Sequence, residues 1–409
     1  MFILYDQEKQ KFPVKIWLEN ISQLDEGCIE QAINLSNLPF LHQWVVLMPD
    51  THQGFGMPIG GVIAAIDTII PNAVGKDIGC GMAYMDTNIR KSELSENEYK
   101  HLVGQIMRNI PTGFEKHSKL QESEEFLNFH EMVREGSEFA NNQKNKHPEL
   151  WKRCFPNAFQ QIGTLGSGNH FIEIQEDENE LLGIMVHSGS RNMGSQIADY
   201  FDHLAKNMNK QERSNVPASY DLAYLSVKDE TGQDYIQWMN MALTFAMYNR
   251  KRMMDIIKME MKKKLPHIQF LNEVNAHHNY AAKERHYGKE VWVHRKGAIC
   301  VSKGMLGIIP GAMGSYSYIV EGLGNAESFD SCSHGAGRVL SRNKAKERYS
   351  VEDTLLDLMK NHVILGKNNK KDVSEESRKA YKDIDFVISQ ELDIVRPIKK
   401  LKTICVIKG

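Results

Sequence analysis

The sequence lacks the cysteine pattern of a disulfide-bonded scaffold or a structural zinc module. Its six cysteines are scattered over 409 residues, and no two of them form a C-x-x-C pair. Both classes of protein depend on such spacings, so neither describes this chain. We therefore expect reduced thiols and a cytoplasmic protein.

Long apolar runs are also missing. No stretch reaches the roughly 18 consecutive apolar residues that a membrane-spanning helix needs. The opening residues, MFILYDQEKQ, contain too short an apolar run for a secretory signal. We expect no contact with a membrane, which agrees with a cytoplasmic location.

A strong charge of one sign is the third absence. The 50 Lys and Arg nearly balance the 52 Asp and Glu, for a formal net charge of −2. Any binding of nucleic acid therefore needs a local basic surface, because the protein as a whole does not attract it. Low-complexity linkers and internal repeats are absent as well. With 41% hydrophobic and 25% charged residues, the composition predicts one α+β domain over residues 1–409.

Helical periodicity is clear in four segments. Ser95-x-x-Glu98 forms a capping box, and Pro111 ends the helix that follows it. Further helices are predicted over 195–208, over about 235–264 and over 350–358, with a helical insertion at about 195–265. Short apolar runs bounded by glycine predict strands at 59–70, 171–174, 181–186, 291–301, 317–323 and 403–407. We expect residues 112–150 to mix short helices with loops.

A glycine-rich turn, "VGKDIGCGM", holds an acid and a thiol three residues apart, at Asp77 and Cys80. A carboxylate and a thiolate are metal ligands, and the glycines leave room for an ion. A small buried cysteine in a tight turn has the same pattern. The turn alone does not decide between these two interpretations.

Three further turns place histidines in similar surroundings. His170 follows the turn of "LGSGNHFIEI", and His187 ends the apolar run of "IMVHSGSRNMG". "NEVNAHHNYA" contains His277 and His278, followed by Asn279. A single histidine at a strand end is usually a satisfied core or surface group. One Asp, one Cys and three His together form a ligand set for one or two metals, and the softness of these ligands favours zinc.

Two turns have the features of phosphate-binding loops. "HSGSR" exposes backbone N–H groups beside Arg191, and "SCSHGAGRVLSR" surrounds His334 with small residues and places Arg338 and Arg342 after it. Small residues let a phosphate approach the backbone, and arginine adds a bidentate charge. His334 is therefore a candidate ligand, general acid or nucleophile toward phosphorus. The alternative is a structural imidazole in the turn that starts a helix.

These turns belong to a longer series of motifs. From "PVKIW" at 13–17 to the final "VIKG", the chain also contains "MPDTHQGFGMPIGGV", "RKGA", "GIIPGAMG", "GLGN" and "AYKDID". In this order the sequence resembles the RtcB-type RNA-splicing ligases over essentially its whole length. The resemblance implies a single RtcB-like domain whose mixed β-sheets surround a deep cleft for metal and nucleotide. It also implies a GTP- and manganese-dependent enzyme that joins RNA 2′,3′-cyclic phosphate or 3′-phosphate ends to 5′-hydroxyl ends in RNA splicing or repair.

The resemblance also assigns the metal ligands. Cys80 corresponds to a thiolate that bridges two Mn²⁺ ions, with Asp77 and His278 completing one site and His170 and His187 the other. Manganese is a harder ion than this ligand set suggests, so the family and ligand softness disagree. We expect Mn²⁺ as the physiological ion and tight binding of zinc.

His334 corresponds to the histidine that is guanylylated by GTP. Tyr381 is similar to the aromatic residue that stacks on the base, and Glu173 and Lys408 correspond to the pair that reads the guanine edge. Arg191, Arg338 and Arg342 are expected to contact RNA phosphates. One departure is Ala312, where many relatives carry serine, so one hydrogen bond to the nucleotide is lost. The positions implied for the guanine nucleotide are Asn169, His170, Phe171, Glu173, Asn279, Pro310, Gly311, Met313, Ser317, Gly335, Ala336, Gly337, Tyr381 and Lys408.

Two other functions compete with a ligase. A dinuclear metal phosphodiesterase needs the same metal ligands but neither His334 nor GTP. A non-catalytic RNA-binding protein tolerates the loss of ligands, and every ligand implied by the resemblance is present here. The resemblance leaves room for an activating protein partner, and no motif identifies one.

Overall fold

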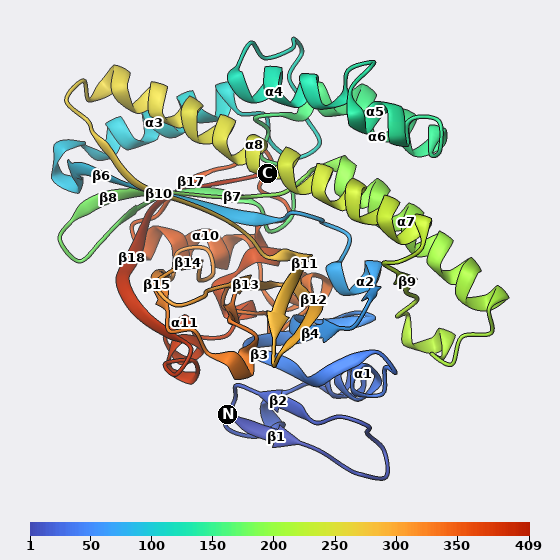
Figure 1. The fold of residues 1–409 in the computed structure, drawn as a ribbon. Helices are drawn as coiled ribbons and strands as arrows, with labels where there is room; N and C mark the ends of the chain where they lie inside the picture. The colour runs from blue at the N-terminus through green and yellow to red at the C-terminus, as the bar shows by residue number, and fades with distance from the viewer.

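The computed structural model describes residues 1–409, and Figure 1 shows the chain from its N-terminal strands to its C-terminal strand. None of its helices is long and apolar enough to cross a membrane. The helices are α1 (Glu26–Ser36), α2 (Pro71–Val74), α3 (Glu96–Asn109), α4 (Glu124–Val133), α5 (Glu138–Gln143), α6 (Pro148–Gln161), α7 (Asn192–Gln211), α8 (Glu230–Lys264), α9 (Arg342–Arg348), α10 (Val351–Lys360) and α11 (Ile384–Gln390).

A six-stranded sheet lies toward the N-terminal end of the molecule. β2 and β3 run parallel and the other neighbours run antiparallel, so the sheet is mixed. α1 packs on this sheet through an apolar cluster that includes Ala32 and Leu35. In spatial order the strands are β1 (Phe2–Leu4), β2 (Val14–Ile16), β3 (Leu41–Phe55), β4 (Met57–Ala65), β12 (Lys289–Lys296) and β11 (Asn279–His286).

An eight-stranded sheet forms the centre of the molecule. Its two edge strands contact each other, so the sheet nearly closes on itself. In spatial order the strands are β10 (Phe270–His277), β6 (Gly81–Arg90), β8 (Leu181–Ser188), β7 (Phe171–Glu176), β18 (Val395–Lys408), β15 (Tyr316–Gly322) and β14 (Leu306–Ile309), and β17 (Ile364–Gly366) pairs with β18 in parallel. Two short ladders complete the strands, β13 (Ala298–Cys300) with β16 (Ser331–Ser333) and β5 (Thr68–Ile69) with β9 (Leu225–Ser226).

The alternation of side chains along a strand gives the two faces of the central sheet different roles. Ile172 and Ile184 point to the face that α3 and α8 cover, within one apolar cluster. Phe171 and Met185 belong to a separate cluster on the opposite face, together with Leu358 of α10. Residues that share the second face with Phe171 are therefore turned away from the long helices.

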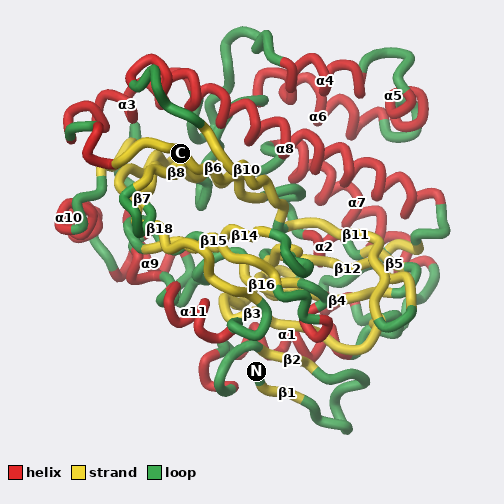
Figure 2. The backbone as a smooth tube through the Cα atoms, turned by 60° about the vertical axis from the view of Figure 1, so that its left-hand side comes forward, coloured by secondary structure: helices red, strands yellow, loops and turns green.

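Helices α4 to α8 form a layer above the central sheet, which Figure 2 shows as a group of red segments beside the yellow strands. They share one apolar cluster that includes Phe129 of α4, Phe155 of α6, Phe201 of α7 and Trp238 of α8. The helical region is therefore larger than the predicted insertion at 195–265, because α4 to α6 pack into the same cluster. The segment 112–150 is a mixture of helix and loop, as expected.

The predicted α+β class is confirmed, as are the main helices. Ser95 caps α3 in a capping box with Glu98, and α10 lies where the helix of 350–358 was predicted. Two predicted strands are each divided in the structure. The run at 59–70 gives β4 and β5, and the run at 291–301 breaks at Gly297, whose φ of +66° interrupts the strand between β12 and β13. Several strands were not predicted, among them β3, β6, β10, β11 and β14.

Candidate active site

Four neighbouring strands bring the expected metal ligands to one place. The order β10-β6-β8-β7 joins strand ends that are far apart in the sequence. Cys80 immediately precedes β6, and His170 immediately precedes β7. His187 lies near the end of β8, and His278 stands between β10 and β11. All four side chains are buried.

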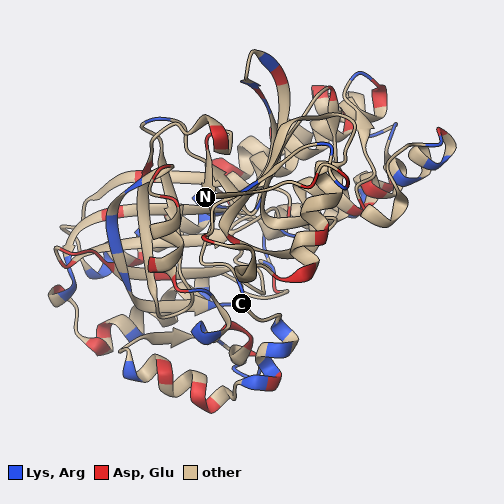
Figure 3. Ribbon diagram, turned by 90° about the horizontal axis from the view of Figure 1, so that it is seen from below, with Lys and Arg blue, Asp and Glu red and all other residues tan.

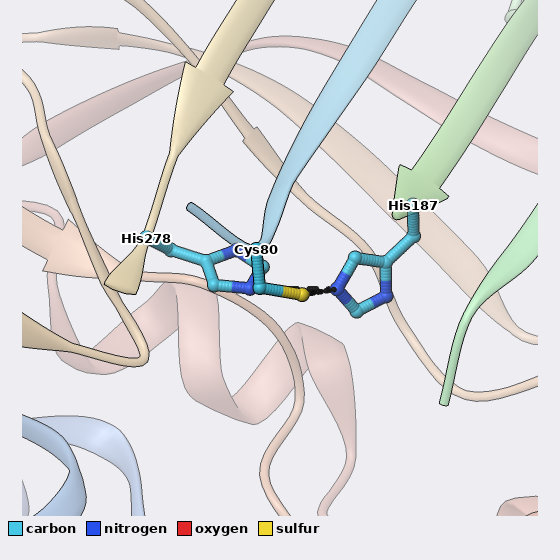
Figure 4. A group of neighbouring side chains, drawn as sticks. All are labelled: Cys80, His187 and His278. Atoms are coloured by element: carbon cyan, nitrogen blue, oxygen red, sulfur yellow. Dashed lines mark hydrogen bonds between the residues drawn. The ribbon is translucent and has the colours of Figure 1, made fainter. Parts of the chain in front are cut away.

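The ligand atoms of these residues lie within a few ångströms of one another. Sγ of Cys80 is 3.2 Å from Nε2 of His187, as the dashed line in Figure 4 marks, and 3.4 Å from Nε2 of His170. Oδ2 of Asp77 is 3.0 Å from the same nitrogen of His170. The Nε2 atoms of His187 and His278 are 3.4 Å apart. The five residues singled out in the sequence therefore converge.

Their grouping corrects one expectation. Cys80, His187 and His278 form one set of donors, and Asp77, Cys80 and His170 form the other, with all donor atoms of a set within 4.8 Å. The sequence-based division paired Asp77 with His278 and His170 with His187. The strands dictate the observed pairing, since His187 faces His278 while the carboxylate of Asp77 turns to His170. Cys80 belongs to both sets, as expected of a bridging ligand.

The hydrogen bonds behind the cluster fix the tautomers of two imidazoles. Nδ1 of His170 donates to the carbonyl of Leu165 at 2.9 Å, and Nδ1 of His187 donates to the carbonyl of Asn169 at 3.2 Å. A carbonyl accepts only from an N–H, so each Nδ1 carries a proton and each Nε2 is the nitrogen that faces the cluster. Nε2 of His278 faces Nε2 of His187 at 3.4 Å, so a cation between the two rings would take a lone pair from each. This donor set fits a pair of metal ions.

The charges of the cluster agree with this interpretation. Burial and neighbouring imidazoles hold the pKa of His187 and of His278 well below 6.5, so both rings are neutral. Burial and the carboxylate of Asp77 raise the pKa of the Cys80 thiol well above 9. For Asp77 itself, burial raises the pKa, but the hydrogen bond and charge of His170 outweigh it. A metal that binds here has to displace the thiol proton, as metals at thiolate sites do.

Steric constraints explain why glycine occupies several positions around the cluster. A Cβ at Gly81 would collide with the carbonyl oxygen of Ala276 in β10, and a Cβ at Gly189 would collide with the carboxylate of Asp77. The small residues that marked these turns in the sequence therefore allow the backbones and ligands to approach.

One residue that sequence analysis missed connects the turns. Arg250 of α8 is fully buried and donates from Nη1 to the carbonyls of Gly79 and Ser188, at 2.9 and 2.8 Å. Its Nη2 lies 3.1 Å from Nδ1 of His277. His277 thus belongs to the supporting network, and it is in neither set of donors. In the sequence Arg250 is an ordinary residue of a long helix, with no signal of this role.

The candidate nucleophile is held by a second residue that the sequence did not single out. Nδ1 of His334 lies 2.6 Å from Oδ2 of Asp50, which also accepts the backbone N–H of His334 at 3.2 Å. Asp50 is fully buried. Because Nδ1–H donates to Asp50, Nε2 of His334 is the nitrogen left with a free lone pair. The His334 ring lies 4.8 Å from the ring of His278, centroid to centroid, beside the metal ligands.

His334 lines a cavity of about 350 Å³. Most of the residues implied for the guanine nucleotide also line this cavity. Ala312, the departure from serine, lines it too, and His52, Gln53, Ser341 and Glu376 are lining residues that sequence analysis missed. The expected nucleotide residues that line the cavity are Asn169, Phe171, Glu173, Pro310, Gly311, Met313, Gly335, Ala336, Gly337, Tyr381 and Lys408.

Three expected nucleotide residues do not line the cavity. His170 is part of the metal cluster. The side chain of Asn279 donates to the carbonyl of Asp77 at 3.1 Å and accepts the N–H of Gly297 at 2.8 Å, so it braces the metal turn. Ser317 is buried, and its Oγ accepts from the side chain of Gln175 at 3.1 Å.

Lys408 is held within the cavity wall. Its Nζ lies 2.9 Å from Oε2 of Glu376, and the residue is 3% exposed. Tyr381 donates to the same oxygen at 2.9 Å, and Arg338 lies 3.2 Å from the other. Burial raises the pKa of Glu376, but the charges of Lys408 and Arg338 outweigh it and lower this pKa to about 2. Glu376 is therefore the counter-ion that lets a lysine remain charged inside the protein.

Glu173 lies on the site face of β7, two residues after Phe171. Its carboxylate accepts from Gln175 Nε2 at 2.6 Å and from Thr403 Oγ1 at 3.0 Å. Burial raises its pKa from 4.5 to about 7, although both hydrogen bonds and Lys408 act in the opposite direction. Near neutral pH this carboxyl therefore exists in both protonation states.

The three arginines expected to contact RNA differ in exposure. Arg342 has a side chain that is 48% exposed and lines the cavity. The guanidinium of Arg338 is already engaged, with Glu376, Tyr381 and two backbone carbonyls. Arg191 donates to Thr164 Oγ1 at 3.1 Å and to the carbonyl of Gly113 at 2.8 Å. Only Arg342 is thus directed to a surface that RNA can reach without rearrangement.

Comparisons with known proteins show which family the chain resembles. The model of the family described as tRNA-splicing ligase RtcB matches residues 31–409. The chain is 40% identical over 407 residues to RNA-splicing ligase RtcB1 of Escherichia coli strain ATCC 25922, covering 97% of each chain. It is 39% identical to RNA-splicing ligase RtcB of Escherichia coli K12, again over 97% of each.

An archaeal relative extends the match. The tRNA-splicing ligase RtcB of Pyrobaculum aerophilum is 34% identical over 469 residues, which cover 98% of this chain and 95% of the relative. Near-complete coverage means that the metal cluster, the cavity and the sheets that carry them all lie inside the matched region. The chain therefore belongs to the RtcB family of RNA-splicing ligases.

Proposed function

We propose that the protein is an RNA ligase that uses GTP and two Mn²⁺ ions. It joins RNA ends with a 2′,3′-cyclic phosphate or a 3′-phosphate to ends with a 5′-hydroxyl, through a guanylylated His334. The whole chain, residues 1–409, acts as one ligase domain. A cytoplasmic location is supported by the cysteines, which are all free and mostly buried.

The observation that carries the proposal is the pairing of His334 with Asp50. With Nδ1–H bound to a buried carboxylate, Nε2 of His334 is available in the cavity as a nucleophile. In the first step Nε2 forms a bond to the α-phosphorus of GTP, and the bond from that phosphorus to the pyrophosphate oxygen breaks. The positive charge that develops on the ring is stabilised by Asp50, which keeps its position throughout.

The next two steps transfer GMP from His334 to the RNA and then release it. The RNA 3′-phosphate takes GMP from His334, so the N–P bond breaks and the imidazole regains its lone pair. The 5′-hydroxyl oxygen then attacks the activated 3′-phosphorus, the phosphodiester forms and GMP leaves. A 2′,3′-cyclic phosphate is first hydrolysed to the 3′-phosphate.

The metal ligands would hold manganese directly beside the nucleophile. Cys80, His187 and His278 would bind one ion, and Asp77, Cys80 and His170 the other. Bound there, the ions supply Lewis-acid stabilisation of the phosphate oxygens that carry negative charge. Arg250 and Asn279 keep the ligand turns in place.

Glu173 and Lys408 support the choice of GTP. A guanine base carries N–H donors at N1 and N2, which the carboxylate of Glu173 accepts, and an acceptor at O6 for Lys408. Adenine reverses this edge and offers neither the N–H donors that Glu173 accepts nor the acceptor that Lys408 needs. Such a mismatch disfavours adenine, because a donor of the base then faces a donor of the site and an acceptor faces an acceptor.

A labelling experiment tests the proposal. The protein is incubated with Mn²⁺ and GTP labelled at the α-phosphate and then separated by denaturing electrophoresis. We expect a labelled protein band that is labile in acid and stable in alkali, and no label in His334→Ala. The variant should keep its metal content, because His334 is in neither donor set. A labelled His334→Ala protein would assign the nucleophile elsewhere, and an unlabelled wild type that still opens cyclic phosphates would favour a phosphodiesterase.

A further inference from the structure

Phe114 is the most exposed large apolar side chain of the protein. It is 95% exposed, whereas the next, Met359, is 65% exposed. It stands in the loop between α3 and α4, outside every apolar cluster. Because burial of a phenylalanine ring is favourable, this exposed ring is available to a partner that covers it.

The loop that carries Phe114 is fixed on both sides of it. The N–H of Gly113 donates to the carbonyl of Gly166 at 2.8 Å, and the N–H of Leu165 donates to the carbonyl of Pro111 at 2.9 Å. After Phe114, the N–H of His117 donates to the carbonyl of Gln160 at 2.9 Å. The ring is therefore presented from an anchored backbone.

Arg191 takes part in this anchoring. Its Nη2 donates to the carbonyl of Gly113, the residue that precedes Phe114. Arg191 lies just after the metal ligand His187, so it connects the metal cluster to the loop. Arg191 therefore holds the backbone of the residue next to Phe114.

Phe114 lines a cavity of about 220 Å³ that adjoins the cavity of His334. Arg342, Glu376 and Lys408 line both cavities and form the wall between them. Several blue segments gather near the C-terminus in Figure 3. At Gly168 a Cβ would come within 2.9 Å of the Arg342 guanidinium, so this glycine lets the arginine lie on the loop.

We propose that the cavity of Phe114 binds a nucleobase of the RNA strand that carries the 3′-phosphate. The base stacks on Phe114 while Arg342 contacts a phosphate of the same strand. The inference rests on the proposed function, since it presupposes an RNA substrate at His334. An isolated aromatic ring beside an exposed guanidinium matches a base and its phosphate, whereas a protein partner typically needs a broad apolar patch. Stacking is tolerant of sequence, so this contact suits an enzyme that accepts different RNA ends.

Binding of a short RNA with a fluorescent 5′ label and a 3′-phosphate tests the inference, without GTP so that no reaction occurs. Phe114→Ala should raise the Kd roughly tenfold, the usual effect of losing one stacked base. Phe114→Tyr should restore most of the affinity. Leu120→Ala removes another exposed apolar side chain of the same loop and should leave the Kd unchanged.

A coupling experiment locates the stacked base. Oligonucleotides that lack the base at one of the last three positions are bound to the wild type and to Phe114→Ala. At one position the loss of the base should weaken binding to the wild type about tenfold and to Phe114→Ala hardly at all. Absence of such coupling at all three positions overturns the inference. The inference is also overturned if Phe114→Ala weakens the binding only of an RNA that has a 5′-hydroxyl and no 3′-phosphate.

Guanylylation separates this inference from the proposed function. The reaction of His334 with GTP requires no RNA, so Phe114→Ala should form the labelled adduct at the rate of the wild type. If the wild type forms no adduct, the proposed function fails. If the adduct forms normally and RNA affinity does not depend on Phe114, only the stacking site is wrong.

Discussion

Nδ1 of His334 and Oδ2 of Asp50 are 2.6 Å apart, although the two residues are separated by 284 positions in the sequence. The pair joins β3 of the six-stranded sheet to the loop after β16. It determines which imidazole nitrogen is free and where that nitrogen lies. The first prediction follows from this pair.

Asp50→Asn should reduce the rate of adduct formation at least about 100-fold, because a neutral amide stabilises the developing imidazolium less and permits the wrong tautomer. The rate is measured in a single turnover with labelled GTP. Metal content should equal that of the wild type, since Asp50 is not a ligand. An unchanged rate would mean that Asp50 only packs against the histidine.

Cys80→Ser should lower manganese occupancy and adduct formation together, because both donor sets include the thiolate. Metal content is measured after gel filtration, and adduct yield at limiting Mn²⁺. His277 and His278 form a matched pair of controls: His278→Ala should lose metal, and His277→Ala should retain much more of it. A Cys80→Ser variant with normal adduct yield would identify Cys80 as a packing residue.

Affinity for GTP should increase with pH between about 6 and 8. The pKa of Glu173 is about 7, and only the ionised carboxylate accepts both N–H groups of guanine. Below this pKa the affinity should fall, by up to tenfold for each pH unit. The Kd is measured by calorimetry in a His334→Ala background, which prevents the reaction.

Glu173→Gln provides the control for this pH dependence. Metal binding also changes with pH, and it changes equally in the variant, so the difference between the two curves reports the carboxyl group. The variant should bind GTP more weakly at pH 8 and show a flatter curve. Parallel curves would exclude Glu173 as the titrating group.

Lys408→Ala should reduce guanylylation and narrow the preference for GTP over ATP. It should also cost roughly 3 kcal/mol of folding free energy, because Glu376 is left buried with only Arg338 as a charged partner. The double variant with Glu376→Gln should recover stability and leave the base preference narrow. Recovery of selectivity together with stability would show that Lys408 acts through folding alone.

Arg342→Gln should weaken RNA binding and lower the slope of log Kd against log salt by about one phosphate contact. The side chain is half exposed beside the cavity, so its substitution should leave guanylylation less affected than ligation. An unchanged slope would place the RNA path elsewhere, for example along Lys262, Lys263 and Lys264 at the end of α8.

Much of the candidate site could be predicted because each ligand has a local signature. His170 and His187 stand where an apolar run meets small residues, and Cys80 lies in a turn that only glycines permit. The division of ligands between the two donor sets was not predictable in this way, since it depends on which strands are neighbours. Asp50 and Arg250 were missed for a related reason. Their contacts lie far away in the sequence, 284 positions for Asp50 with His334 and 171 positions for Arg250 with Gly79, and the local pattern around either residue does not indicate them.

The prediction of the fold from the sequence was limited in the same way. Helices with caps and prolines, such as α3 after Ser95, were located closely. β3 and β6 were missed because polar residues interrupt their apolar pattern, as at Asp50 and Asp86. Those polar residues are buried and have roles in the interior, so the local pattern and the tertiary structure disagree there.

The metal ligands extend from Asp77 to His278, and the turns that carry them are tied together by Arg250 of α8. Neither donor set has all three of its donor atoms together until these strands and this helix have docked. Binding of the proposed metals would therefore follow folding, in contrast to a zinc finger, whose ion drives folding. The ion that enters is selected by the finished pocket from the free metals around it. The supply of manganese relative to zinc at that moment would then decide how much of the newly made protein becomes active.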